Sequence, residues 1–172
     1  MTEQIAVFGS AFNPPTQGHA SVLAQLCHFD KVLLVPSYRH AWGKMMAPYE
    51  TRCGWVQALI HDLRLPNLHL CQREASLGRE GDAVTTHMLL SALQDDYPDA
   101  ALTFVVGPDN LLKFDQFADS AQILSRWSVL GMPETVVVRS THIRERLAQG
   151  LPIDDLTTPS IAAQLSEAVF CR

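Results

Sequence analysis

Short apolar runs that alternate with helix-like segments constrain this sequence most strongly. The runs at residues 4–9, 31–36 and 101–107 are rich in branched and aromatic residues and are too short for buried helices. Between the first two, apolar residues recur at helical spacing within residues 17–29. Strands that alternate with helices predict βαβ units. We therefore expect an α/β fold, a Rossmann-like, doubly wound and mostly parallel sheet with helices on both faces and short C-terminal helices.

The same patterns predict the remaining elements. Residues 37–50 and 73–83 lack periodicity and are expected to be loops, the second of them mobile. No internal repeat or linker divides the chain, so residues 1–172 are expected to form one domain. Further strands are expected at residues 67–72, 127–131 and 135–138, and helices at 17–29, 48–63, 83–97, 140–150 and 159–170.

Composition excludes several functional classes. The 172 residues are 47% hydrophobic and 18% charged, with a net charge of -5, which argues against a general nucleic-acid or anionic-membrane binder. No apolar run approaches the length of a membrane-spanning helix. The four cysteines contain no CxxC pair and are typical of reduced thiols in a cytoplasmic protein; they are Cys27, Cys53, Cys71 and Cys171.

The stretch GSAFNPPTQGHASVL, residues 9–23, follows the first predicted strand. Doubly wound folds bind nucleotides at this edge of the sheet. Gly9 has no Cβ, so it and Ser10 let the backbone approach a ligand closely. Pro14 and Pro15 stiffen the loop and reduce the entropy lost on binding. The loop is therefore a candidate phosphate site.

Gly18 and His19 open the helix after this loop, where free N–H groups favour phosphate. An imidazole can donate to a phosphoryl oxygen, and does so more strongly when charged. The glycines match neither GxGxxG nor GxxxxGK[ST]. From the residues alone, a strand-to-helix turn with Thr16 as its cap and an incidental histidine is an equal alternative.

Two separated signatures carry a resemblance to a known superfamily. Thr16-Gln17-Gly18-His19 matches [T/H]xGH, and VRSTHIR at residues 138–144 matches ISSTxIR. The chain thus resembles the nucleotidyltransferase superfamily named after its HIGH motif. The GSAFNPPT loop, VVGPDNLLKF at 105–114 and STHIRERLAQG at 140–150 are similar to the nicotinate/nicotinamide mononucleotide adenylyltransferases.

The resemblance implies transfer of AMP from ATP to a pyridine mononucleotide with release of pyrophosphate, a step of NAD synthesis. Such a reaction needs positioning and charge neutralisation more than covalent help. It implies Mg²⁺ held mainly by ATP phosphates, which requires few protein ligands. The implied catalytic residues are His19, Lys44 and Arg144, and the implied ATP-binding residues are Gly9, Ser10, Phe12, Thr16, Gly18, His19, Gly107, Asp109, Ser140, Thr141 and Arg144.

On the acceptor side the resemblance implies Asn13, Lys44, Thr85 and Phe117. Lys44 lies in HAWGK at 40–44, and a solvated loop is the competing interpretation for it. Phe117 could stack on the pyridine ring or be a core residue. Asp109 could accept from ribose hydroxyls, cap a helix, or do both.

Several positions depart from the family pattern. Thr16 stands where close relatives often have histidine, and Arg139 replaces the first serine of ISSTxIR. The tyrosine of a tyrosine-threonine pair that holds the mononucleotide in relatives is replaced by Val84. Arg52 is expected to be a helix-surface charge.

The sequence leaves the acceptor open between nicotinate and nicotinamide mononucleotide, and it leaves open a homo-oligomer. One alternative is another HIGH-motif adenylyltransferase, such as a phosphopantetheine adenylyltransferase. A second is a regulatory module that binds nucleotides without turnover. The second signature favours the mononucleotide enzymes, and we expect His19 and Arg144 to reach one phosphate-sized space.

Overall fold

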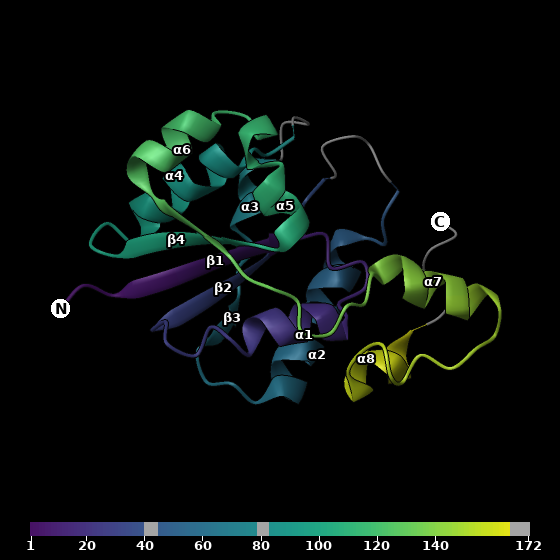
Figure 1. Cartoon of the computed structure of the whole chain (residues 1–172). Helices are drawn as coiled ribbons and strands as arrows, with labels where there is room; N and C mark the ends of the chain where they lie inside the picture. Colours follow the sequence, from purple (N-terminus) through teal and green to yellow (C-terminus); the bar gives the residue numbers. More distant parts are fainter. Residues whose placement is uncertain (40–44, 79–82, 166–172) are drawn as a thin grey trace.

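A computed structural model describes residues 1–39, 45–78 and 83–165. Its centre is a parallel five-stranded sheet with strand order β3-β2-β1-β4-β5 (Figure 1). β1 pairs with β2 on one side and with β4 on the other, so the chain winds outward from β1 in both directions. The Rossmann-like, doubly wound prediction is confirmed. The strands are β1 (Gln4–Ser10), β2 (Lys31–Pro36), β3 (Leu68–Leu70), β4 (Ala101–Val106) and β5 (Ser128–Gly131).

Helices cover both faces of the sheet because the central strands are apolar on both sides. In β1, Ala6 and Phe8 belong to the core cluster that includes residues of α1 (Gln17–Leu23) and α2 (Tyr49–Leu63). Figure 1 shows these two helices on the same face of the sheet. Ile5 and Val7 pack toward α4 (Thr86–Asp96) and α6 (Ser120–Arg126). Strands buried on both faces read as continuous apolar runs, which is why these runs were recognisable.

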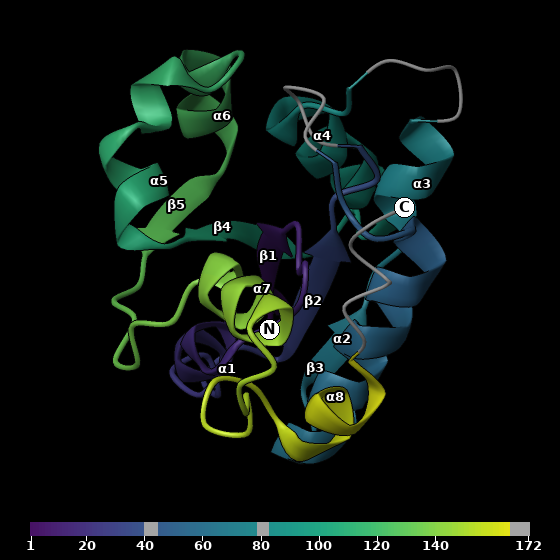
Figure 2. The ribbon, with the colours of Figure 1, turned by 90° about the vertical axis from the view of Figure 1, so that its right-hand side faces the viewer.

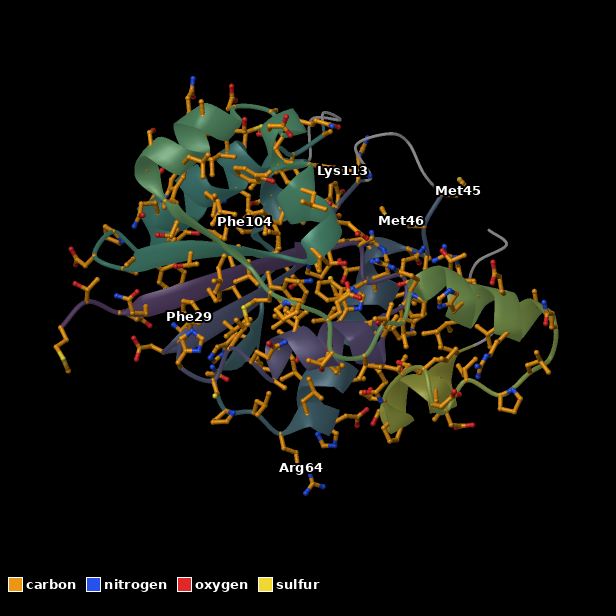
Figure 3. All side chains as sticks on the ribbon, viewed as in Figure 1. Phe29, Met45, Met46, Arg64, Phe104 and Lys113 are labelled. Carbon is orange, nitrogen blue, oxygen red and sulfur yellow. The ribbon has the colours of Figure 1, made fainter. Side chains whose placement is uncertain are left out.

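The face covered by α4 and α6 also holds Phe104, which lies between β4 and this helical layer (Figure 3). Three short helices complete the sheet's surroundings: α3 (Arg73–Leu77), α5 (Pro108–Leu112) and the 3-10 turn η1 (Phe114–Gln116). The sequence analysis did not predict α5, η1 or α6. The predicted loop at residues 73–83 is wrong for its first five residues, where α3 forms and buries Glu74; residues 79–82 lie outside the described residues.

Two further predicted elements differ from the structure. α1 ends at Leu23 instead of reaching Phe29, yet Leu26 and Phe29 are buried because turns return them to the core. Residues 135–138 form no strand. Val137 is 71% exposed, so this β-branched segment runs along the surface without pairing.

The segment 135–138 is held close to α1 instead. A Cβ at Gly18 would lie 2.9 Å from the carbonyl oxygen of Val138 and 3.2 Å from that of Val136. Only glycine permits this approach of two backbones. Gly18 therefore joins the first signature to the segment that leads into the second.

The C-terminal helices α7 (Ser140–Ala148) and α8 (Pro159–Gln164) lie beside the sheet. Figure 2 looks onto the carboxyl edge of the strands and shows α7 in front of β1. The backbone N–H of Gln17 donates to the carbonyl of Leu156 at 2.8 Å, which ties the chain before α8 to the start of α1. None of the helices in the described ranges has the length and apolar character needed to cross a bilayer.

Candidate active site

A cavity of about 200 Å³ opens at the carboxyl ends of β1 and β4. This volume is below that of most sites for drug-sized ligands, so the cavity can enclose one part of a nucleotide. It is the edge where doubly wound folds bind ligands. Its walls are formed by Phe8, Gly9, Ser10, Thr16, Gly18, His19, Val22, Val106, Gly107, Asp109, Asn110, Glu134, Val138, Arg139 and Ser140.

Thr16 caps α1. Its Oγ1 accepts the backbone N–H groups of Gly18 at 3.0 Å and of His19 at 3.3 Å. The same hydroxyl donates to the carbonyl of Val138 at 3.2 Å. Thr16 lines the cavity but is 1% exposed, so its hydroxyl is committed to holding the helix start and the facing segment.

His19 is held in one tautomer. The backbone N–H of Thr16 donates to its Nδ1 at 3.0 Å, so the ring hydrogen is on Nε2, which lies 3.0 Å from the Oγ of Ser10. The centroid of the His19 ring lies 4.8 Å from the centroid of the Phe12 ring. Burial, with a smaller effect from the charge of Arg139, lowers the pKa of His19 to about 4. The side chain is therefore neutral at pH 7 and offers an N–H rather than a positive charge.

The side chain of Phe12 contacts the ring of His19 and does not line the cavity. Its side chain is fully buried and does not line the cavity, and its backbone adopts a positive φ of 48°. The ring contacts both His19 and Phe8. It therefore helps to fix the position of the imidazole. That Phe12 contacts ATP stays a prediction.

Arg144 reaches the same loop from α7. Its guanidinium donates to the carbonyl of Asn13 at 2.7 Å and to the Oγ1 of Thr141 at 3.2 Å. Ser140 donates from Oγ to the carbonyl of Pro14 at 2.7 Å. The second signature is thus bonded to the first. Arg144 and Thr141 do not line the cavity described above, and burial lowers the pKa of Arg144.

The opposite wall carries charged groups. Gly107 lies at the end of β4, and Asp109 follows in α5. Arg139 is the N-cap residue of α7; it donates to Asp109 at 2.6 Å and lies 3.5 Å from the carboxylate of Glu134. The sequence offered no signal for Glu134, which precedes the signature in an exposed segment.

The residues expected on the acceptor side have the following contacts. Asn13 is buried and its Oδ1 accepts the backbone N–H of Ala47 at 3.1 Å. Thr85 caps α4 by accepting the N–H of Met88. Phe117 packs against other aromatic rings of the core. Lys44 lies outside the described residues. A role of these positions in acceptor binding stays a prediction.

Arg52 is the clearest error of the sequence analysis. It is 1% exposed and not a surface charge. Its guanidinium donates to the carbonyls of Ala11, Ser37 and Ala47 at 2.7–2.9 Å, which joins the connection after β1 to the one after β2 at the carboxyl edge of the sheet. The signal was available, because Arg52 occupies the same helical face as the buried Trp55 three residues later.

Within the described ranges, no group of three histidine, cysteine or acidic side chains could hold a metal ion. Asp109 and Glu134 are the carboxylates of the cavity wall, and Arg139 pairs with both. A Mg²⁺ ion bound here would therefore depend on phosphate oxygens and water for most of its ligands.

A family model for cytidylyltransferase-like proteins matches residues 7–146, a span that contains both signatures. A protein of Anaeromyxobacter dehalogenans assigned as a nicotinate-nucleotide adenylyltransferase is 30% identical, covering 98% of this chain and 97% of its own. The chain belongs to the nicotinate-nucleotide adenylyltransferases. A second family member, from Myxococcus xanthus, is 32% identical over 95% of this chain and 92% of its own.

Solved structures of adenylyltransferases have the same fold. A crystal structure assigned as a nicotinate-nucleotide adenylyltransferase from Vibrio parahaemolyticus is 44% identical, with a TM-score of 0.85 over 94% of this chain and 91% of that one. A Plasmodium falciparum nicotinic acid mononucleotide adenylyltransferase complexed with NaAD is 15% identical, with a TM-score of 0.76 over 94% and 93% of the two chains. The family assignment makes this protein a nucleotidyltransferase enzyme.

Proposed function

We propose that this protein transfers AMP from ATP to nicotinate mononucleotide and releases pyrophosphate. The observation that carries the proposal is the Nε2–H of His19, which lies beside Ser10 in a cavity bordered by residues of both signatures. The names of the family members at 30–44% identity support nicotinate rather than nicotinamide mononucleotide as the acceptor.

In this reaction a phosphate oxygen of the mononucleotide attacks the α-phosphorus of ATP. A new P–O bond forms as the bond from the α-phosphorus to the bridging oxygen of pyrophosphate breaks, and the leaving group takes that electron pair. The protein has to align the two phosphates and stabilise charge on the phosphoryl oxygens. The neutral His19 fits this role because it donates a hydrogen bond from a fixed position without needing to lose a proton.

Magnesium enters this proposal with ATP, as the Mg-ATP complex, and neutralises phosphate charge when bound. A cytoplasmic location also stays our proposal. It is supported by the cysteines of the described part of the chain, Cys27, Cys53 and Cys71, which are free thiols.

The proposal is tested with a panel of acceptors under saturating Mg-ATP. Nicotinate mononucleotide, nicotinamide mononucleotide and phosphopantetheine are each supplied, and pyrophosphate release is followed. We expect the highest kcat/KM with nicotinate mononucleotide. Faster turnover of phosphopantetheine would contradict the proposal, and binding of ATP without release of pyrophosphate in the presence of any of the three acceptors would indicate a regulatory module.

A further inference from the structure

The inference concerns Arg139, which stands where the family signature has a serine. Its backbone opens α7 and its side chain lines the cavity together with Ser10 and His19. The side chain is 49% exposed, so solvent and ligands can reach it. Among the described residues that line the cavity, it is the only lysine or arginine.

The charge of Arg139 acts on the same space as His19. Both side chains line the cavity, and the positive charge of Arg139 adds to the effect of burial in lowering the pKa of the imidazole. His19 is neutral, and Arg144 does not line this cavity and donates instead to the carbonyl of Asn13, so neither places a positive charge on the cavity wall. A polyphosphate that enters needs a cation on the wall, and Arg139 is positioned to provide it.

Two carboxylates hold Arg139. Its NH2 group lies 2.6 Å from Oδ2 of Asp109 and its NH1 group 3.5 Å from Oε1 of Glu134. Asp109 is 63% exposed, and ion pairs at such exposed positions contribute little to stability. A ligand with several negative charges can therefore displace Asp109 from the guanidinium at low cost.

We propose that Arg139 binds the β- and γ-phosphates of ATP by exchanging its contact with Asp109 for phosphate oxygens. The planar guanidinium can donate two parallel hydrogen bonds to one phosphate, which the serine of the family signature cannot do. The exchange frees the Asp109 carboxylate from its ion pair, so that it can accept hydrogen bonds from other groups of the nucleotide. The inference rests on the proposed function for the identity of ATP, but its test does not require an acceptor.

Inorganic pyrophosphate in the presence of Mg²⁺ is the probe, because it presents the two phosphates without adenosine. Its affinity is measured by isothermal titration for the wild type, Arg139→Gln, Arg139→Lys and Asp109→Asn. Arg146→Gln is the matched control, since Arg146 lies on the same helix, is 38% exposed and pairs with Asp155 away from the cavity.

Arg139→Gln should weaken pyrophosphate binding about tenfold or more, because it removes charged hydrogen bonds and leaves two carboxylates on the wall. Arg139→Lys should be intermediate. Asp109→Asn should strengthen binding about threefold, because it removes the competing partner of Arg139. Arg146→Gln should leave the affinity unchanged.

Three results would overturn the inference: no binding of pyrophosphate by the wild type, equal affinity of the wild type and Arg139→Gln, or equal weakening by Arg139→Gln and Asp109→Asn. The last would mean that the ion pair only joins α5 to α7. If Arg139→Gln loses pyrophosphate but the wild type turns over no acceptor, the proposed function fails and the inference stands. If turnover is intact and KM for ATP is unaltered in Arg139→Gln, the inference fails alone.

Discussion

Two segments carry residues of the cavity wall, and they are held in different ways: one is the loop that connects the wall residues Ser10 and Thr16, and the other contains the wall residues Glu134 and Arg139. The loop at residues 11–15 is mostly buried, and four of its five carbonyl oxygens accept hydrogen bonds from side chains of distant elements. The segment at residues 132–139 is largely exposed, and its charged groups are joined by ion pairs. The donors to the buried loop are Arg52, Arg144, Ser140 and Thr157, which bind the carbonyls of Ala11, Asn13, Pro14 and Pro15.

This difference teaches where the site is rigid and where it can change. Hydrogen bonds to buried carbonyls are expensive to break, because each lost partner leaves a buried acceptor unsatisfied. Exposed ion pairs exchange partners at little cost. His19 is thus fixed by a rigid loop, while Arg139 on the opposite wall is free to respond to the charge of a ligand.

Removal of Arg52, which holds the loop at residues 11–15, should lower the free energy of unfolding more than any other change proposed below. Arg52→Met leaves three buried carbonyls without their donor, so we expect the free energy of unfolding to fall by about 3–5 kcal/mol. Urea denaturation measures the change. Arg64→Met is the control, because Arg64 ends the same helix and points into solvent (Figure 3). Equal stability of the two variants would contradict the anchoring role of Arg52.

His19→Ala should separate chemistry from stability. Loss of one fixed donor to the reacting phosphate should lower kcat by about 100–1,000-fold, with a much smaller change in thermal stability. Pyrophosphate release measures kcat, and His28→Ala at an exposed position is the control. A folded His19→Ala protein with wild-type kcat would remove the histidine from the mechanism.

Gly18→Ala tests the contact between the two segments. The new Cβ would meet the carbonyls of Val136 and Val138, so we expect a loss of about 1–3 kcal/mol and displacement of the 132–139 segment. Gly54→Ala has nothing within 4 Å and lies inside α2, so it should stabilise by about 0.5–1 kcal/mol. Changes of the same sign and size in both variants would show that the close approach is unimportant.

Glu74 provides a smaller, pH-dependent test of the buried side. Burial raises the pKa of Glu74 from 4.5 to about 7, although its carboxylate accepts the N–H of Tyr38. Between these values the unfolded chain ionises while the folded chain keeps the proton. The contribution of Glu74 to stability therefore falls as pH rises from 4.5 to 7, by up to about 1 kcal/mol per pH unit.

Unfolding at several pH values measures this slope. Glu74→Gln should flatten it within that window, whereas Glu50→Gln at an exposed position on α2 should leave it as in the wild type. An unchanged slope in Glu74→Gln would show that the carboxyl is ionised at the same pH in both states.

The sequence predicted the sheet well because its strands are buried on both faces, as β1 and β2 show. It predicted β-structure wrongly at 135–138, since valines favour a strand only where a neighbouring strand can pair with them. It missed α3 because five residues are too few for periodicity. Local patterns cannot report partners that are distant in the chain.

The same limit applies to the site. The two signatures located the cavity wall, including Ser10, His19 and Ser140. They did not show that Arg144 would bond to the loop itself, nor that Arg139 would line the cavity in its place. Those positions depend on how α7 is docked, and this docking rests on contacts such as Ser140 to Pro14, which are 126 positions apart.

The long reach of these bonds determines when the site can be assembled during biosynthesis. The carbonyl of Pro15 can accept its hydrogen bond only after Thr157, 142 positions later, has been synthesised. The N–H of Gln17 can donate to the carbonyl of Leu156 only after that residue has been synthesised. A ribosome that has made the chain as far as His19 has therefore made the loop but none of the four side chains that donate to its carbonyls. Contacts between such distant positions form slowly, because a long chain must first be closed. We therefore expect the loop at residues 11–15, although it lies near the start of the chain, to be among the last parts of the protein to reach its final structure.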